Sequence, residues 1–220
     1  MTAPARSDPA AFIRANSEVL EAPLVPGIKL HLASEVIPLW QATETELAAV
    51  GLPPPFWAFA WAGGQAIARY LLDHPEVVAG KRVLDFATGG GLQAIAAKRA
   101  GAAAVEAVDI DPFACAAARL NAALNDVDIR VTCRDRVGEP NPGWDVVLAG
   151  DVCYEGPMTL RIEAWLRAIA GAGTLVLLGD PGRSYLPKEG LERIVAYAVK
   201  TSRELEDTDV RNAAVWRVRG

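Results

Sequence analysis

An apolar run that ends in three glycines, Val-Leu-Asp-Phe-Ala-Thr-Gly-Gly-Gly, occupies residues 83–91. It predicts a buried strand at 82–86 that leads through a tight turn into a helix at 92–100. Glycine has no Cβ, so Gly89 and Gly91 can adopt positive φ and let the backbone approach a ligand closely. A strand, a glycine turn and a helix in this order indicate an α/β fold with a cofactor-binding loop.

A second predicted strand, at 105–110, carries Asp109, twenty positions after Gly89. A carboxylate at this place can accept both hydroxyl groups of a ribose, so the ligand is expected to contain a nucleoside. The loop also matches the Gly-x-Gly-x-x-Ala fingerprint of dinucleotide-binding proteins. A dehydrogenase needs a proton relay, however, and the sequence has no Tyr-x-x-x-Lys motif and no histidine on a strand edge near the loop.

Strands and helices alternate through most of the chain, which predicts a mostly parallel sheet with helices on both faces. The expected strands are 82–86, 105–110, 129–133, 144–149 and 174–179, and the expected helices are 62–74, 92–100, 112–124, 158–169 and 189–200. Two more strands, 204–210 and 213–219, are predicted to form a closing antiparallel hairpin around a tight Arg211-Asn212 link.

The first part of the chain reads as an extension. A short helix is predicted over residues 7–21, with Asp8 as its cap and Pro9 in its first turn, and a short extended piece over residues 28–32. The triple proline at 53–55 marks a stiff boundary. We therefore expect an N-terminal extension at 1–55 that packs on a main domain at 56–220.

Composition excludes several kinds of protein. A chain of 220 residues, half of them apolar, can bury one core, and its net charge of −5 comes without a basic cluster that would follow a phosphate backbone. The three cysteines form no Cys-x-x-Cys pair, so we expect neither a disulfide framework nor a metal site. No signal peptide and no membrane span is evident. We expect a soluble, cytoplasmic monomer that binds neither nucleic acid nor membrane.

Acidic residues stand at or after the ends of the predicted strands: Asp85, Asp109, Asp135 and Asp151, the last in the segment Asp151-Val152-Cys153-Tyr154. This series resembles the motifs of the seven-strand S-adenosylmethionine-dependent methyltransferases. The Asp-x-x-Tyr form resembles both the signature of their lysine methyltransferases and, more loosely, the Asp-Pro-Pro-Tyr motif of amino-directed nucleic-acid methyltransferases. Both classes act on nitrogen.

The resemblance implies a Rossmann-like fold with S-adenosylmethionine as the cofactor. It implies that Asp151 orients the acceptor amine and that Tyr154 packs against the alkyl stem of this acceptor or presents its ring to the ammonium. Cys153 is expected to form part of the wall, because methyl transfer from a sulfonium needs no covalent enzyme intermediate. The residues expected to contact the cofactor are Trp57, Trp61, Asp85, Thr88, Gly89, Gly91, Asp109, Ile110, Asp135 and Ala149.

Several of these residues also have a purely structural interpretation. Asp85 can order the loop, and the aromatic segment 56–61 can be core packing. Asp151 can cap the following helix or order a loop. The end of the third strand is hard to align, so the sequence does not decide whether Asp135 contacts adenine.

Three stretches, 24–32, 38–44 and 55–65, are together similar to the family of electron transfer flavoprotein β-subunit lysine methyltransferases. That resemblance implies methylation of lysines on the flavoprotein β subunit, which would be the protein partner. The alternatives are an enzyme of the ribosomal-protein L11 type, a methyltransferase for small amines, and a non-catalytic module that only binds the cofactor.

Overall fold

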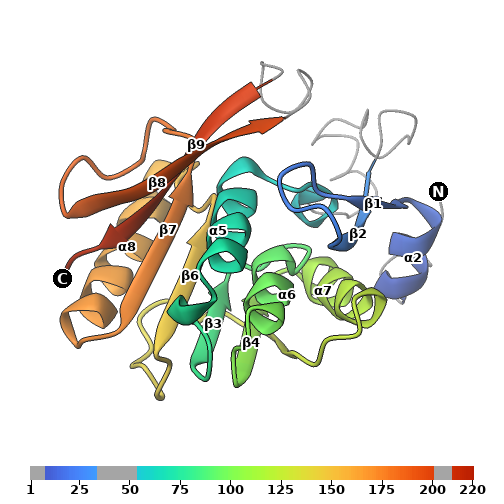
Figure 1. Ribbon diagram of the computed structural model, residues 1–220, viewed down its shortest axis with the longest axis horizontal. Coiled ribbons are helices and arrows are strands. Elements are labelled where there is room, and N and C mark those ends of the chain that lie inside the picture. The colour runs from blue at the N-terminus through green and yellow to red at the C-terminus, as the bar shows by residue number, and fades with distance from the viewer. Residues whose placement is uncertain (1–7, 34–53, 201–209) are drawn as a thin grey trace.

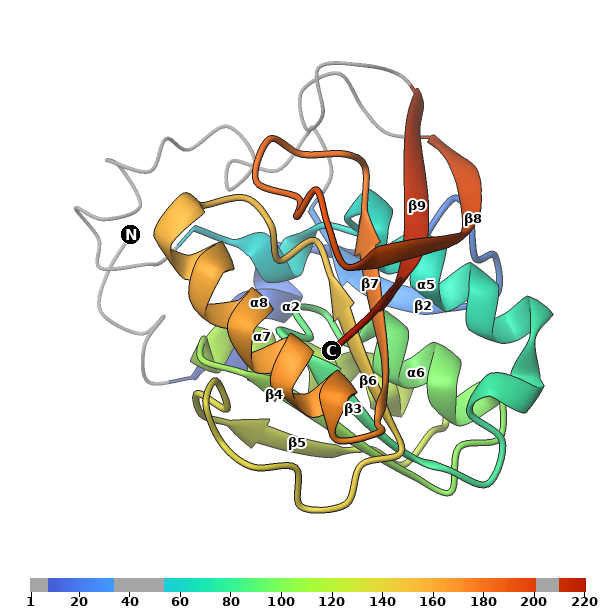
Figure 2. The same cartoon turned by 90° about the vertical axis from the view of Figure 1, so that its left-hand side faces the viewer.

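The computed structural model describes residues 8–33, 54–200 and 210–220. Its centre is a seven-stranded sheet in the order β5-β4-β3-β6-β7-β9-β8, drawn in Figures 1 and 2. The five strands that pair in parallel are β3 (Arg82–Phe86), β4 (Ala104–Asp109), β5 (Arg130–Cys133), β6 (Val146–Gly150) and β7 (Leu175–Asp180). The strands β8 (Leu191–Lys200) and β9 (Val210–Val218) add to β7 in antiparallel direction. The predicted fold class is confirmed.

Helices cover both faces of the sheet (Figure 2). One face carries α5 (Ala62–Asp73), α6 (Leu92–Arg99) and α7 (Pro112–Leu124), and the other carries α8 (Gly156–Gly171). Two apolar layers result. Ile67 and Leu71 of α5 pack with the sheet in one layer, and Trp165 of α8 packs against Phe86 in the other, with 4.9 Å between the ring centroids. Burial of these layers drives the assembly of the sheet with its helices.

The N-terminal elements lie against α7 (Figure 1). They are α2 (Pro9–Ala15), β1 (Glu18–Glu21) and β2 (Lys29–Leu32). Asp8 caps α2 as predicted, because its carboxylate accepts from the Ala11 N–H. The predicted helix over 7–21 is wrong beyond Ala15, since β1 follows. The side chains of Asn16 and Ser17 donate to the last carbonyls of α2, which ends the helix there.

The C-terminal part of the chain requires two corrections. Residues 189–200 were predicted as a helix, but they contain the strand β8. Arg211 and Asn212 were predicted to link a hairpin, but both lie inside β9 and pair with Val199 and Ala198. The expected strand at 204–210 lies outside the described residues apart from Val210.

The remaining elements are two short 3-10 helices, η1 (Phe56–Ala58) and η2 (Pro75–Val77). None of the helices that the structure describes combines the length and the apolar character required to cross a lipid bilayer.

Candidate active site

The glycine turn after β3 has the predicted conformation. Gly89 and Gly91 have φ values of 51° and 83°. A Cβ on Gly91 would lie 3.2 Å from the Cα and Cβ of Ala118 in α7, so this glycine lets the turn pack on α7. A Cβ on Gly89 would meet only the Cα of Trp57, at 4.0 Å, which leaves the space beside Gly89 open.

Asp85 lies beneath this turn and is fully buried. Its carboxylate accepts from the Thr88 hydroxyl (2.5 Å), the Ala94 N–H (2.9 Å) and the Gln93 side-chain amide (3.1 Å). Burial raises the pKa of Asp85 to about 7, although the bonds from Thr88 and Ala94 act in the opposite direction. The direct contacts of Asp85 therefore order the loop and the start of α6.

A cleft of about 580 Å³ opens at the carboxyl ends of β3, β4 and β6. Eight predicted site residues line it: Trp57, Trp61, Gly89, Asp109, Ile110, Asp135, Asp151 and Tyr154. Four others lie outside its lining: Asp85, Thr88, Gly91 and Ala149. Ala149 is fully buried in the core, next to the lining residue Gly150, and Thr88 holds Asp85. Their contact with a cofactor stays a prediction.

Asp109 stands at the end of β4 beside the glycine turn. One carboxylate oxygen accepts from the Gly89 N–H at 2.9 Å and the other from the Asp111 N–H at 3.0 Å. Each carboxylate oxygen can take two hydrogen bonds, so both retain capacity for a ligand hydroxyl. Burial raises the pKa of Asp109.

Two further predicted cofactor residues lie on the same side of the cleft. Ile110 is 72% exposed and presents an apolar surface there. Asp135, after β5, accepts from the Val137 N–H at 2.8 Å and lies 3.7 Å from the Arg161 guanidinium.

Aromatic rings form the opposite wall of the cleft. The Phe56 ring lies 5.5 Å from the Tyr154 ring and 6.1 Å from the Trp61 ring, measured between centroids. The Trp61 indole N–H donates to the Phe56 carbonyl at 2.9 Å, which fixes the segment. Trp57 is buried in a core cluster with Phe113 and also lines the cleft. The segment 56–61 thus serves both the core and the cleft.

Asp151 follows β6 with a φ of 60°, an uncommon value for a residue other than glycine. Its carboxylate accepts from the Gly63 N–H (3.1 Å) and the Gly64 N–H (2.6 Å) and pairs with the Arg183 guanidinium (2.5 Å). The alternative interpretation made Asp151 a cap for the helix that follows it, but in the structure its carboxylate caps the earlier helix α5. Burial raises the pKa of Asp151, and Arg183 opposes that rise.

Glycines allow α5 to come this close to the strand ends. A Cβ on Gly63 would lie 2.3 Å from the Gly179 carbonyl oxygen, and a Cβ on Gly150 would lie 2.9 Å from the Cα of Gly64. Such distances are far below van der Waals contact. The helix N-terminus therefore reaches Asp151 only because these positions carry no side chain.

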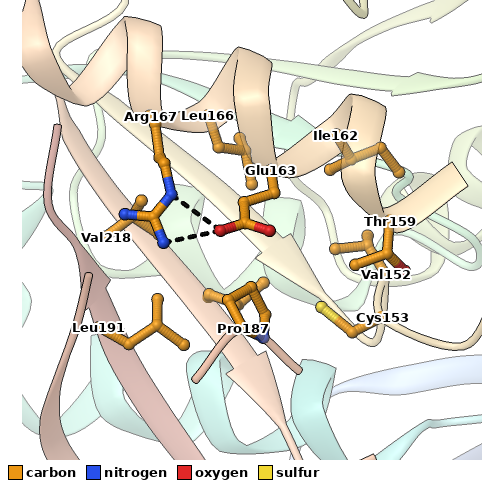
Figure 3. Close-up of a pocket in the computed structure, with 11 residues that line it drawn as sticks. Val152, Cys153, Thr159, Ile162, Glu163, Leu166, Arg167, Pro187, Leu191 and Val218 are labelled. Carbon is orange, nitrogen blue, oxygen red and sulfur yellow. Dashed lines mark hydrogen bonds and ion pairs between the residues drawn. The ribbon is translucent and has the colours of Figure 1, made fainter. Parts of the chain in front are cut away.

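Val152 and Cys153 lie beside Thr159 and Ile162 of α8 (Figure 3). They contact a small apolar space beside Ile162, next to the pair of Glu163 and Arg167. Cys153 is 2% exposed and burial raises its pKa to about 12, which makes it a wall residue. Val152 also lines the large cleft with Asp151 and Tyr154, so the loop borders both spaces.

Arg183 was not among the predicted residues. Its guanidinium also lies 3.3 Å from the Asp180 carboxylate and 6.0 Å above the Trp61 ring. The available signal was Asp-Pro-Gly-Arg directly after a buried strand, a turn that sets an arginine at the edge of the sheet.

Carboxylates outnumber cations in the lining. Five acidic residues, Asp109, Asp111, Asp135, Asp151 and Glu155, face three basic ones, Arg134, Arg161 and Arg183. Aromatic faces and an excess of carboxylates favour ligands with positive charge.

The chain is similar to known methyltransferases. The ribosomal protein L11 methyltransferase (PrmA) family matches residues 66–152. The electron transfer flavoprotein β-subunit lysine methyltransferase of Danio rerio is 37% identical over 94% of this chain and 81% of its own length. The protein of the same description from Homo sapiens is 35% identical over 94% of this chain and 80% of its own.

Solved structures agree on the fold. A magnesium protoporphyrin IX methyltransferase from Synechocystis with bound S-adenosylmethionine superposes with a TM-score of 0.53, at 20% identity, over 71% of this chain and 78% of that one. At this identity the likeness supports the fold alone.

The cleft fits S-adenosylmethionine as the cofactor. Asp109 retains hydrogen-bond capacity for ribose hydroxyls, Ile110 offers an apolar face for adenine, and Gly89 leaves room for close approach. The carboxylates and aromatic rings match a positive sulfonium.

Proposed function

Because this chain belongs to the family of electron transfer flavoprotein β-subunit lysine methyltransferases, we propose that it methylates lysine side chains of an electron transfer flavoprotein β subunit. The match over nearly the whole chain supports this substrate. One structural observation carries the proposal: Asp151 and Tyr154 line the same cleft as Asp109, so groups for the acceptor and for the cofactor share one space.

S-adenosylmethionine supplies the methyl group and is already activated by its positive sulfur. We assign its ribose to Asp109 and its adenine to the surface formed by Ile110 and Asp135. Further contacts with the cofactor are proposed for Trp57, Trp61, Asp85, Thr88, Gly89, Gly91 and Ala149. Asp151 and Tyr154, which follow β6 on the other side of β3, then face the acceptor.

The acceptor amine must lose its proton before it can act as a nucleophile. A free lysine has a pKa of about 10.4, so only about one in a thousand is neutral near pH 7.4. Desolvation between the Phe56 and Tyr154 rings lowers that pKa. In the proposal Asp151 accepts a hydrogen bond from the amine and orients its lone pair, and Tyr154 packs on the methylene stem.

A second candidate, methylation of a ribosomal protein of the L11 type, is favoured by one observation, the match of that family to residues 66–152. This segment runs from α5 to the start of the Asp151 loop and therefore covers mainly the cofactor half of the cleft. Relatives that match 94% of the chain support the flavoprotein more strongly.

We also propose a monomer that works in the cytoplasm, with residues 1–55 as an extension on the methyltransferase domain. The packing of Phe12 on Phe113, at 5.3 Å between ring centroids, and the bond from the His31 N–H to the Asn121 side chain (2.8 Å) support the packing of this extension on the domain. Size-exclusion chromatography with light scattering tests the monomer.

The substrate is tested by incubating the enzyme and labelled S-adenosylmethionine with a proteome from cells that lack the enzyme. We expect one labelled protein, identified by mass spectrometry as the flavoprotein β subunit. Label on the L11 protein alone would support the second candidate, and label on nucleic acid or small amines would contradict both.

A further inference from the structure

We infer that Arg183 is a positioning residue for the methyl acceptor, which sets both the direction and the charge state of Asp151 and disfavours a protonated amine beside it. This inference rests on the proposed function, because it treats the end of β6 as the acceptor side of the cleft. Arg183 itself acts through Asp151.

The arginine is held in place by its own strand end. Asp180, the last residue of β7, accepts from the backbone N–H groups of Gly182 and Arg183, both at 2.7 Å. The other oxygen of Asp180 lies 3.3 Å from the Arg183 guanidinium. Asp180 thus fixes both the turn and the Arg183 side chain. The guanidinium, held in this way, fixes the Asp151 carboxylate through their ion pair.

The hydrogen bonds of Asp151 hold its carboxylate in one orientation. One oxygen accepts from Gly63 and from Arg183, and the other accepts from Gly64. A carboxylate has about four acceptor positions, so one remains, on the oxygen that Gly64 contacts. An amine that reaches Asp151 can therefore bind in one way, which fixes the direction of its lone pair.

The position of Arg183 in the sheet separates it from the groups for adenosine. Asp109 and Asp135 follow β4 and β5 on one side of β3, whereas Asp151 and Arg183 follow β6 and β7 on the other. A guanidinium at the end of β7 thus belongs to the acceptor side.

The charges around Asp151 indicate what the guanidinium does. In the part of the chain that the structure describes, the charged and titratable groups that act on Asp151 are Asp180 at the end of β7, Arg183 in the turn after it and Cys153 on its own loop. The helix α5 adds the N–H groups of Gly63 and Gly64. Without Arg183, two buried carboxylates would lie close together with no cation between them. Asp151 would then either take up a proton at higher pH or, while ionised, hold a lysine ammonium in place of the guanidinium, and both outcomes oppose a neutral amine at the site.

The test compares Arg183→Met with Arg183→Lys, which keeps a positive charge near the position of Nη1. Arg69→Met is the matched control, because Arg69 also pairs with an aspartate, Asp73, but on the surface of α5 at 2.5 Å. Three quantities are measured: the titration of the Asp151 carboxyl by carbon-13 NMR, the dependence of kcat on pH with the flavoprotein β subunit, and calorimetric affinity for S-adenosylhomocysteine.

In Arg183→Met we expect the Asp151 titration and the acidic limb of kcat to move upward by about one pH unit or more. We expect kcat at neutral pH to fall at least tenfold, with cofactor affinity changed less than twofold. In Arg183→Lys the Asp151 titration and the acidic limb of kcat should lie at their wild-type pH. Arg69→Met should match the wild type in all three quantities.

The inference is overturned if the Asp151 titration stays in place, or if kcat falls equally at every pH. A tenfold loss of cofactor affinity would also overturn it and assign the guanidinium to the cofactor. If the wild-type enzyme leaves the flavoprotein unlabelled, the proposed function fails, while the NMR titration, which needs no substrate, still decides whether Arg183 controls Asp151. Should Arg183→Met not fold, the Arg183→Lys variant is expected to retain the wild-type titration.

Discussion

The Asp151 carboxylate lies 2.6 Å from the backbone nitrogen of Gly64 and so caps a helix that precedes it by 87 residues. The residue at the N-cap position of α5, Trp61, makes no capping bond with its side chain. The loop proposed to hold the acceptor and the helix that follows the aromatic segment are thereby joined. Changes on α5 should affect both.

Gly63→Ala and Gly64→Ala form a matched pair at the start of α5. The added Cβ at position 63 would meet backbone at 2.3 Å, whereas at position 64 its nearest neighbour, Asp151, lies at 3.7 Å. We expect Gly63→Ala to lower the free energy of unfolding by about 3 kcal/mol, and Gly64→Ala to leave it unchanged or raise it by about 1 kcal/mol. Urea denaturation measures both, and equal values would contradict the close packing.

Tyr154 is half exposed at the cleft mouth, so its replacement should spare the fold. We expect Tyr154→Ala to lower kcat/KM about tenfold or more, because the ring that shields the acceptor is lost, and Tyr154→Phe to retain most of the rate. Steady-state kinetics and calorimetry with S-adenosylhomocysteine test this. A parallel fall in cofactor affinity would place Tyr154 in the cofactor pocket instead.

Asp109→Ala should weaken binding of S-adenosylmethionine about 100-fold, since it removes the acceptor for two hydroxyl groups, each worth about 1.5 kcal/mol or more. Asp109→Asn retains one side-chain oxygen, so its affinity for S-adenosylmethionine should lie between those of Asp109→Ala and the wild type. Isothermal titration calorimetry gives the affinities. An unchanged affinity in Asp109→Ala would remove this residue from the site.

Asp85 should give the protein a pH-dependent stability. Its pKa rises from 3.8 to about 7 on folding, so the native state holds a proton that the unfolded state releases between these values. The stabilisation is fully present below pH 3.8 and is lost as the pH rises to about 7, on the order of 1 kcal/mol per pH unit. Unfolding measured from pH 4 to 7 should show this slope in the wild type.

Asp85→Asn should remove that slope, because asparagine does not titrate. The amide fits the site: the Gln93 side-chain oxygen has no hydrogen-bond partner among the described residues, and a rotated Gln93 amide can accept from asparagine. Identical slopes in the two proteins would show that Asp85 ionises normally.

Local sequence patterns predicted several of the residues that meet at the carboxyl edge of the sheet. The glycine turn, Asp109 and the Asp-x-x-Tyr segment each follow a strand, and parallel strands bring their carboxyl ends to one edge. The structure places Gly89, Asp109, Asp151 and Tyr154 around one cleft accordingly. Arg183 was missed because its role depends on pairing with Asp151, 32 residues away, which no local pattern contains.

The strand β8 was mistaken for a helix for a different reason. A shift in register between Arg193 and Val195 interrupts the alternation of buried and exposed residues. From Val195 to Lys200 the alternation is regular, as expected for an edge strand with one covered face. The expected helix continued the strand–helix series of the preceding residues, and pairing with the distant β9 overrides that series.

Labelling of the purified flavoprotein β subunit tests the proposed activity most directly. The enzyme is incubated with labelled S-adenosylmethionine and either the native subunit or a variant whose lysines in the region that contacts its dehydrogenase partners are replaced by arginine. Arginine keeps the charge but does not lose its proton. We predict a mass increment of one CH₂ unit per transferred methyl group on these lysines alone, and no increment on the variant. Equal labelling of the variant, or no labelling of the native subunit, would contradict the account.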